Sequence, residues 1–344
     1  MVARASLARD KLGLAMAPSS SLRIDIIPGW SPAPLSLSLV WGLAAVVTLL
    51  TLGWIAAAVL PLLRPTGEYT NLRQRVNSWW VMVALLTLAL VAGWQAMLGL
   101  FAVISFIALR EFLSLAPARA EDRLIILAAY LTIPISYGFI AANEYGIYLV
   151  FIPVYVFLAI PFLMAMIGQT RDYLERAASF HWGVVACVYS IGFAVFLMRT
   201  PAGEPMPAGP AGLVFLLLVA TEANDVAQYC WGKLIGRHKI LPTVSPNKTW
   251  EGFLGGWVTT AALIVLVGPL FAPLAGLNLA IMAVVLPLAG FAGDVTLSAV
   301  KRDIGVKDTS QLIPGHGGIL DRIDSLTFTT PIYFHLMTFF ALHR

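Results

Sequence analysis

The chain has 344 residues, of which 59% are hydrophobic and only 12% are charged. A soluble domain is usually about half apolar and about a quarter charged, so this composition excludes an ordinary water-soluble enzyme. The formal net charge of +4 is better explained by membrane topology than by affinity for nucleic acid, and we expect no nucleic-acid partner. Two cysteines give neither a disulfide framework nor the spacing of a cysteine metal site.

Apolar runs of about twenty residues recur along the chain after a mixed N-terminal segment. Residues 1–34 combine basic residues with serines and prolines, and we expect a disordered tail there. The runs that follow have the length of membrane-spanning helices: 35–63, 79–95, 97–114, 124–142, 147–167, 181–198, 211–230, 253–272, 276–298 and 327–342. The sequence therefore predicts an all-α polytopic integral membrane protein with about ten transmembrane helices and two polar cytoplasmic loops.

Basic residues concentrate in alternate loops between these runs. They follow the first, third, fifth, seventh and ninth spans: Arg64, Arg73, Arg75, Arg110, Arg119, Arg123, Arg171, Arg176, Lys233, Arg237, Lys239, Lys248, Lys301, Arg302, Lys307 and Arg322. By the positive-inside rule these loops are cytoplasmic, and we expect the inner membrane of a bacterium. The basic N-terminal tail is the exception, and a translation start at Met16 would leave only Arg23 in it.

The segment from Ser298 to Asp324 gathers an unusual number of charges of both signs between two apolar runs. It reads SAVKRDIGVKDTSQLIPGHGGILDRID. Glycines let backbone N–H groups approach phosphate oxygens, Lys and Arg neutralise phosphate charge, and carboxylates bind the Mg²⁺ that accompanies a nucleotide triphosphate. A solvated cytoplasmic loop is the simpler alternative. The ordered pattern favours a polyphosphate site instead.

A second polar segment follows the seventh span and reads NDVAQYCWGKLIGRHKILPTVSPNKTWEG over residues 224–252. An acidic residue at the end of an apolar helix, followed by spaced glycines and bases, again suggests phosphate binding. Each short motif in it is weak alone, since loops are commonly rich in Gly, Pro and Ser.

Together the two segments resemble the phosphatidate cytidylyltransferases, also called CDP-diacylglycerol synthases. The first matches every specified position of that family's S-x-hydrophobic-K-R … K-D-x-S … I-P-x-H-G-G-hydrophobic-x-D-R-hydrophobic-D signature, and the second resembles its D-x-x-x-Y-x-x-G-K … S-P-x-K-T region. Gln228 departs from the small residue that usually precedes the tyrosine. A weaker likeness lies at Ala108–Phe112, and the first span resembles an addition to the family plan. The resemblance divides the chain into N-terminal transmembrane helices (35–210) and a catalytic transmembrane region (211–344).

Spacing brings several of these charged residues together. Asp294, Ser298 and Lys301 share one face of a helix, and an aspartate inside an apolar span is costly unless it has a function. A buried ion pair between Asp294 and Lys301 is the alternative. Asp321 and Asp324, three residues apart at the start of the next helix, are also expected to share a face.

The resemblance implies that the phosphate of phosphatidic acid attacks the α-phosphorus of CTP, giving CDP-diacylglycerol and pyrophosphate. The candidate catalytic residues are Asp294, Lys301, Arg302, Asp321 and Asp324. Candidate Mg²⁺ ligands are Asp225, Asp294 and Asp321. Candidate substrate-binding residues are Lys233, Arg237, Ser245, Lys248, Thr249, Lys307, His316, Gly317, Gly318 and Arg322. Membrane depth assigns Lys301 to the lipid phosphate and Lys248 to CTP.

Two other functions compete with this one. A CTP-dependent lipid or polyprenol kinase would transfer the γ-phosphate, and the complete signature argues against it. An anion transporter would use Asp294 and the basic loops to guide its cargo, but it predicts internal repeats that the sequence lacks. The expected partners are CTP, phosphatidic acid and the bilayer, with a homodimer left open.

Overall fold

The computed structural model describes residues 35–342 except for three short linkers, 64–68, 117–121 and 201–205, and residue 169. The expected disordered tail and the question of Met16 therefore lie outside the described residues. The helices are α1 (Leu37–Leu63), α2 (Thr70–Ala92), α3 (Trp94–Leu115), α4 (Arg123–Ala142), α5 (Tyr145–Val150), α6 (Phe157–Met166), α7 (Tyr173–Val184), α8 (Ile191–Met198), α9 (Gly209–Ile235), α10 (Trp250–Phe271), α11 (Gly276–Ile304) and α12 (Leu326–Leu342). Two π-helices, η2 (Phe151–Val156) and η3 (Val185–Ser190), join α5 to α6 and α7 to α8.

The described chain confirms the predicted all-α membrane architecture. Because the π-helices are continuous with their neighbours, α5–α6 and α7–α8 each form one segment. Nine segments are long and apolar enough to span a bilayer, and α12 (17 residues) is slightly shorter than the others. Each segment corresponds to one of the predicted spans. The division between spans two and three falls at Gly93, whose φ of 102° breaks the helix between α2 and α3.

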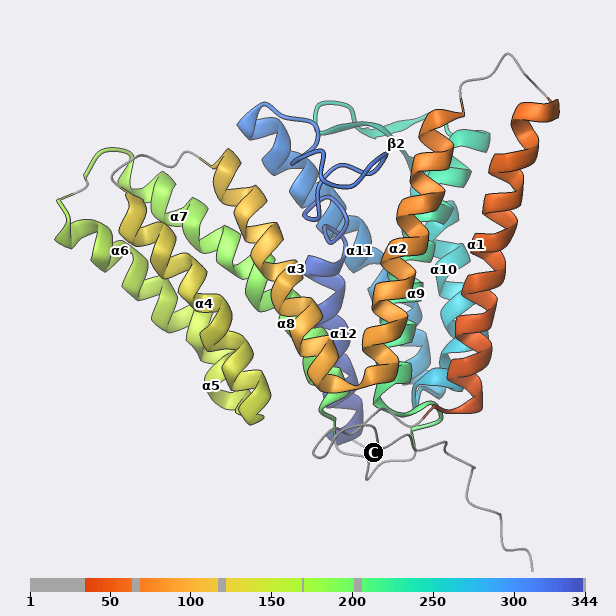
Figure 1. The fold of residues 1–344 in the computed structure, drawn as a ribbon, viewed down its shortest axis with the longest axis horizontal. Coiled ribbons are helices and arrows are strands. Elements are labelled where there is room, and N and C mark those ends of the chain that lie inside the picture. Colours follow the sequence, from red (N-terminus) through yellow and green to blue (C-terminus); the bar gives the residue numbers. More distant parts are fainter. Residues whose placement is uncertain (1–34, 64–68, 117–121, 169, 201–205, 343–344) are drawn as a thin grey trace, which may run out of the picture.

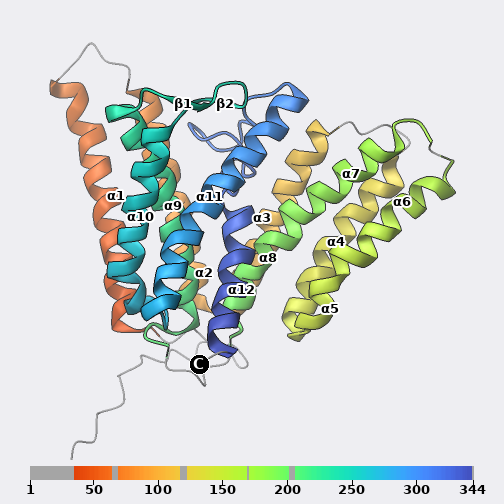
Figure 2. The same ribbon diagram turned by 180° about the vertical axis from the view of Figure 1, so that it is seen from behind.

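The segments form two groups that meet along a central set (Figures 1 and 2). Helices α1, α2, α9, α10 and α11 lie on one side, α4 to α7 on the other, and α3, α8 and α12 between them. The antiparallel hairpin of β1 (Lys239–Leu241) and β2 (Ser245–Thr249) lies at one end of the bundle, beside the loop 305–325. We call this the polar end. The last turn of α12 lies at the opposite end.

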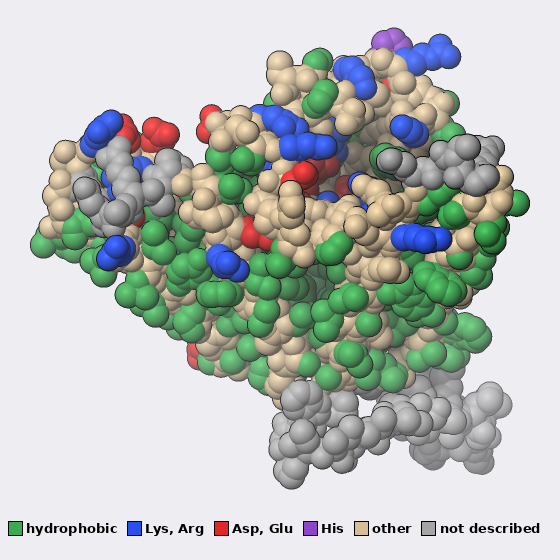
Figure 3. Space-filling view, turned by 45° about the horizontal axis from the view of Figure 1, so that its top comes forward, with side chains coloured by type: hydrophobic (Ala, Val, Ile, Leu, Met, Phe, Trp, Pro, Cys, Tyr) green, Lys and Arg blue, Asp and Glu red, His purple; other side chains and the backbone are tan. Residues whose placement is uncertain are grey.

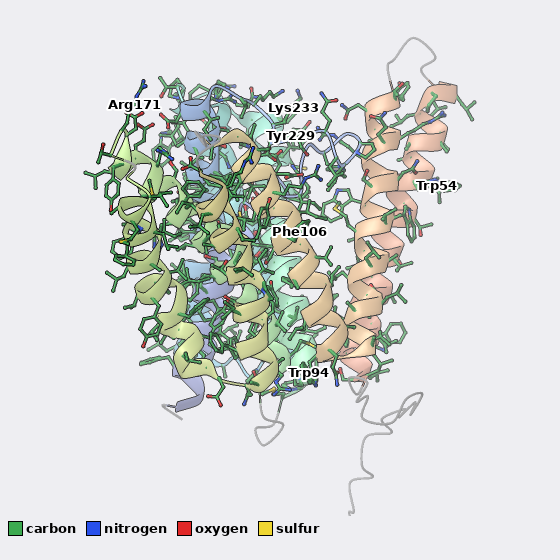
Figure 4. All side chains as sticks on the ribbon, turned by 60° about the vertical axis from the view of Figure 1, so that its left-hand side comes forward. Trp54, Trp94, Phe106, Arg171, Tyr229 and Lys233 are labelled. Carbon is green, nitrogen blue, oxygen red and sulfur yellow. The ribbon has the colours of Figure 1, made fainter. Side chains whose placement is uncertain are left out.

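Charged residues mark the polar end. Figure 4 shows Arg171 and Lys233 there, whereas Trp94 lies at the other end. Spans run beyond their predicted limits on this side: α2 begins at Thr70 rather than 79, and α9 and α11 continue to Ile235 and Ile304. The extra turns contain polar or charged residues, so a search for uninterrupted apolar runs ends too early.

The observed helix ends correct two expectations about the charged residues. Lys301 and Arg302 belong to the last turn of α11 and do not follow it. Helix α11 ends in a Schellman motif, in which Gly305 has a φ of 82° and Val306 N–H donates to the carbonyl of Lys301 at 2.8 Å. Asp321 and Asp324 lie in turns before α12 begins at Leu326, not in its first turn.

Helices α9 and α10 pack backbone to backbone below the hairpin. A Cβ atom on Gly252 would lie 2.8 Å from the carbonyl oxygen of Gln228, so only glycine permits this approach. Thr249 starts α10 as its N-cap, because its side chain accepts a hydrogen bond from Gly252 N–H at 3.2 Å. The hairpin is thereby held directly over the polar end of α9.

Candidate active site

The polar end contains a hollow in which charged side chains of both signs gather. Figure 3 shows Lys and Arg side chains around a recess that holds acidic side chains. A cavity of about 460 Å³ lies between α9, the hairpin, α10 and α11, within the usual volume range of small-molecule sites. The cavity is lined by Asp225, Gln228, Tyr229, Gly232, Lys233, Lys239, Asn247, Lys248, Thr249, Gly252, Phe253, Phe291 and Asp294.

Lys248, near the end of β2, is the cation at the centre of this cavity wall. Its Nζ lies 2.6 Å from Asp294 Oδ2 on α11 and donates to Gln228 Oε1 on α9 at 3.3 Å. It also lies 4.9 Å from the centre of the Phe291 ring. The lysine is 16% exposed and therefore still reaches the cavity. Its partner is the intramembrane Asp294, whereas a pair between Asp294 and Lys301 was the expected alternative.

Three carboxylates from different elements approach one another: Asp225 on α9, Asp294 on α11 and Asp324 in the loop before α12. Gly293 allows it: a Cβ there would lie 2.5 Å from the carbonyl oxygen of Asp324, so the loop runs directly against α11. Burial and the nearby Asp294 and Asp225 carboxylates raise the pKa of Asp324 well above its usual range. Burial and mutual repulsion at Asp324 therefore outweigh the attraction of Arg322 and Lys301.

Asp225 is the least satisfied member of this cluster. Its Oδ2 accepts from Ser325 Oγ at 2.9 Å, while its buried Oδ1 has no hydrogen-bond partner among the described residues. Asp294 is better paired, since Oδ1 accepts from Ser298 Oγ at 3.2 Å, as their shared helix face predicts. A buried carboxylate oxygen without a donor is costly unless a ligand supplies one.

Asp321, by contrast, is saturated by the protein itself. Oδ1 accepts from Lys301 Nζ at 2.8 Å, and Oδ2 accepts from the N–H and hydroxyl of Thr309 and from Gly318 N–H at 2.8–2.9 Å. Burial opposes ionisation, but the bonds from Lys301, Gly318 and Thr309 outweigh it and lower the pKa of Asp321. Asp321 thereby ties the loop 305–325, which we call the signature loop, to Lys301 in the last turn of α11.

Glu111 of α3 also accepts hydrogen bonds from the loop and holds it from the side of α3. Its carboxylate is 6% exposed. It accepts hydrogen bonds from Thr309 Oγ1 (3.2 Å), Ser310 Oγ (2.7 Å), Ile319 N–H (3.1 Å) and Leu320 N–H (2.9 Å). Ser78 of α2 adds a bond to the carbonyl of Pro314 at 2.9 Å. Two N-terminal spans thus fix the signature loop.

The loop therefore forms an anion-binding turn whose anions are two of the protein's own carboxylates. We expected Gly317 and Gly318 to offer N–H groups to phosphate, but Gly318 N–H donates to Asp321. A Cβ on Gly318 would lie 2.3 Å from Glu111 Oε2, so this glycine is required for the carboxylates to enter the turn.

The remaining predicted residues lie around these two clusters. Lys233 and Lys307 are exposed, and the backbone N–H of Arg237 donates to Glu251 Oε2 at 3.0 Å. Arg302 Nε donates to the carbonyl of Val244 at 3.2 Å, which ties α11 to the hairpin turn next to Ser245. Their predicted contacts with substrate stay predictions.

His316 and Arg322 are less accessible. Burial and the positive charge of Arg322 lower the pKa of His316 to about 4, so the imidazole is neutral near pH 7. Arg322 Nε is buried and has no hydrogen-bond partner among the described residues. A neutral His316 suits a hydrogen-bonding role better than that of a cation for phosphate.

The metal ligands expected from the sequence do not form a complete cage. Among the described residues, no group of three or more His, Cys, Asp or Glu side chains is arranged to hold a metal ion. Mg²⁺ that arrives with a nucleotide needs only one or two carboxylates, since phosphates and water fill the other positions. The unpaired Oδ1 of Asp225, close to Asp294, fits that arrangement, whereas both oxygens of Asp321 are already occupied.

Two residues of the site were missing from the predicted set. Glu111 belongs to the Ala108–Phe112 motif, but only the fold brings it into contact with Thr309, which lies 198 residues further along the chain. Gln228 was noted as a departure from the family pattern, and its contact with Lys248 depends on the hairpin folding back over α9. A polar residue at the end of an apolar span was the available signal for both.

Comparison with known proteins places the chain among nucleotidyltransferases. It is 39% identical over 276 residues to the uncharacterized protein YnbB of Escherichia coli K12, covering 80% of this chain and 89% of that protein. It is 39% identical over 132 residues to a phosphatidate cytidylyltransferase of Mycobacterium leprae, covering 38% of this chain and 42% of that enzyme. It is 36% identical over 160 residues to a phosphatidate cytidylyltransferase of Brucella suis, covering 46% of this chain and 58% of that enzyme.

These enzymes match only in part, so the chain spans about half of the length of the named phosphatidate cytidylyltransferases. The family model covers far more of the chain. It matches residues 73–340, from the start of α2 to the end of α12, and includes both carboxylate clusters and the hairpin. On this match the chain belongs to the cytidylyltransferase family.

Proposed function

We propose that this protein is a CTP:phosphatidate cytidylyltransferase, which makes CDP-diacylglycerol and pyrophosphate for phospholipid synthesis. One observation carries the proposal: the cavity at the polar end combines the partly buried pair of Lys248 and Asp294 with an Asp225 oxygen that has no hydrogen-bond partner among the described residues. A cation and an unsatisfied carboxylate side by side suit a metal-bound phosphate. The names of the partly matching relatives agree with this substrate class.

The reaction needs positioning more than acid–base chemistry. An oxygen of the phosphatidate phosphate forms a bond to the α-phosphorus of CTP. The bond from that phosphorus to the oxygen that bridges the α- and β-phosphates breaks, which releases pyrophosphate. The attacking phosphate is already an anion, so no strong base is required. Lys248 would neutralise phosphate charge, and the cavity walls would hold the two groups in line.

Mg²⁺ is the expected cofactor, with Asp225 and Asp294 as its protein ligands and Asp324 beside them. When bound, it would offset the negative charge of the triphosphate. Asp225 supports the assignment because its free Oδ1 faces no donor among the described residues. Lys248 and Ser298 then fix the orientation of Asp294 from either side.

The polar end is proposed to face the cytoplasm of a bacterial cell, where CTP is present. The alternation of basic loops supports this orientation. Thr243 is exposed in the hairpin turn, so Thr243→Cys should resist an impermeant thiol reagent in intact cells and react after lysis. Labelling from outside would reverse the topology and remove access to CTP.

The function is tested with purified protein, phosphatidic acid and CTP labelled in either the α- or the γ-phosphate. A cytidylyltransferase transfers label to lipid only from α-labelled CTP and releases labelled pyrophosphate from γ-labelled CTP. Lipid labelled from the γ position would show a kinase instead. No labelled lipid from either, with folded protein, would contradict both enzyme functions.

A further inference from the structure

Gln228 has a buried amide in the wall of the cavity, and the proposed reaction assigns this amide no role. It lies on α9 one turn after Asp225 and is 9% exposed. Its Cγ would lie 2.3 Å from a Cβ on Gly256, so the side chain fills a notch in α10 that only a glycine leaves open. The amide is therefore held in one place by packing.

The contact with Lys248 fixes which way the amide points. A lysine ammonium has only donors, so the amide atom 3.3 Å from Nζ must be the oxygen Oε1. The nitrogen Nε2 then points away from Lys248. It is buried and has no hydrogen-bond acceptor among the described residues.

Two unsatisfied atoms of opposite character thus lie one turn apart on α9. Within the part of the chain that the structure describes, Asp225 Oδ1 lacks a hydrogen-bond donor and Gln228 Nε2 lacks an acceptor. Both residues line the cavity, and Lys248 contacts Gln228. A ligand that satisfies all three groups presents a cation to Asp225 and anionic oxygens to Gln228 and Lys248. A phosphoryl group with a bound divalent cation has this chemistry.

We propose that Gln228 is a substrate-binding residue whose Nε2–H donates to a phosphoryl oxygen of the substrate held by Lys248. This rests on the proposed cytidylyl transfer and adds a specific contact to it. The phosphoryl oxygen belongs either to CTP or to phosphatidic acid, and the kinetics of each substrate distinguish the two. The second role of Gln228 is to orient Lys248 through Oε1.

Two substitutions of similar size separate these roles. Gln228→Met removes both the donor and the acceptor, whereas Gln228→Glu keeps an acceptor for Lys248 and replaces the donor by a negative charge. If Nε2 contacts phosphate, both raise the KM of one substrate by about 10- to 100-fold, and Gln228→Glu is at least as impaired as Gln228→Met. The substrate whose KM changes is the one that provides the oxygen.

Gln95 on α3 provides a matched control. Its Oε1 is also buried without a partner among the described residues, and it follows Trp94 at the opposite end of the bundle. Gln95→Met should leave both KM values within about twofold of wild type, because it lies outside the cavity. The melting temperature of every variant is measured to confirm folding.

Equilibrium binding provides a readout that does not need turnover. Protein in lipid nanodiscs is titrated with Mg²⁺ and a CTP analogue whose α–β bridge is a methylene group, and separately with phosphatidic acid. The dissociation constant of one ligand should rise by about 10- to 100-fold in both Gln228 variants. This loss of affinity can be measured even if the wild-type protein does not transfer cytidylyl groups. Failure of the proposed function can therefore be told apart from failure of the proposed Gln228 contact.

Three results would overturn the proposal. Wild-type KM and binding in Gln228→Glu, with a defect only in Gln228→Met, would leave Gln228 a positioning residue for Lys248. Unchanged KM values and dissociation constants in both variants would mean that Nε2 binds water or only fills space, and does not contact substrate. Equal defects in Gln95→Met would trace the effect to general loss of a buried amide.

Discussion

The cavity wall and the signature loop contain the same kinds of residue in opposite states. In the loop, Asp321 and Glu111 each accept four hydrogen bonds from the protein. In the cavity wall, Asp225 and Gln228 each retain a buried atom without a partner among the described residues. The two loop carboxylates are fully paired by the protein itself, whereas Asp225 and Gln228 in the wall need a ligand to satisfy their buried atoms.

The difference shows that a cluster of charges in a signature need not touch substrate. The two loop carboxylates accept from seven donor groups, with the Thr309 hydroxyl shared between them, and removing both would leave these donors unpaired. Their primary effect is therefore on structure. The wall carboxylates are available to a cation and a phosphate. The predictions below test this division by removing one member of each cluster in turn.

The largest effect on stability is expected at Asp321. In Asp321→Asn one carboxylate oxygen becomes an NH₂ group that faces either Lys301 or the donors of Thr309 and Gly318. Breaking a buried ion pair in this way costs about 3–5 kcal/mol of unfolding free energy. The melting temperature of purified protein should fall markedly, and Asp303→Asn, at an exposed position on α11, should not change it. Normal stability with lost turnover would move Asp321 to the ligand-binding side.

Asp294→Asn should have the largest effect on turnover. The substitution keeps the shape of the side chain but removes the charge that faces Lys248 and the proposed metal ion. We expect a loss of about a hundredfold in kcat/KM with little change in melting temperature. Aggregated protein whose folded fraction has normal specific activity would instead assign Asp294 to the scaffold.

Lys248, in the cavity wall, should have a smaller effect on activity than Asp294. Lys248→Ala is expected to raise the KM for CTP by about 10- to 100-fold, because it removes a partly buried cation from the cavity. Lys233→Ala, on the exposed rim, should change it by less than about threefold.

Lys301→Ala tests the alternative for the loop. Its Nζ is bonded to Asp321, so we now expect a lower melting temperature, whereas membrane depth alone predicted a higher KM for phosphatidic acid. A raised KM in a fully stable variant would restore the prediction from depth. A destabilised variant with a normal KM would confirm the division between the two clusters.

The smallest effect concerns pH and His316. Its pKa in the folded protein is about 4, below the value of about 6.5 in an unfolded chain. Between these values the unfolded chain binds the proton more readily, so stability is retained above about pH 6.5 and is lost as pH falls toward 4. The melting temperature of His316→Gln should fall less steeply over this interval than that of wild type. Identical slopes would contradict the lowered pKa.

The sequence predicted the spans well because their signal is local. Each apolar run is long enough to be recognised without its neighbours, and only the polar ends, such as Thr70–Asn77 of α2, escaped. It also identified the charged residues of both clusters except Glu111. The sequence could not determine which carboxylates are satisfied internally, because Asp294 and Asp321 are equally plausible ligands until their partners are known.

The partners that decide this are remote or backbone groups. Asp321 is occupied by N–H groups of its own loop, whose turns cannot be derived from spacing alone. Gln228 acquires its orientation from Lys248, which reaches it only after the hairpin folds over α9. Long-range pairing of this kind depends on the complete tertiary structure and leaves little trace in local sequence patterns.

The link between Glu111 and the signature loop has a consequence for biosynthesis. Its loop partners follow it by 198 to 209 residues along the chain. At bacterial-like elongation rates of about 5–20 residues per second, α3 is in the membrane for on the order of ten to forty seconds before they are made. During that interval the Glu111 carboxylate has none of its loop donors and depends on water for its hydrogen bonds. Glu111 is therefore a point at which insertion and assembly of the nascent protein are most exposed to delay.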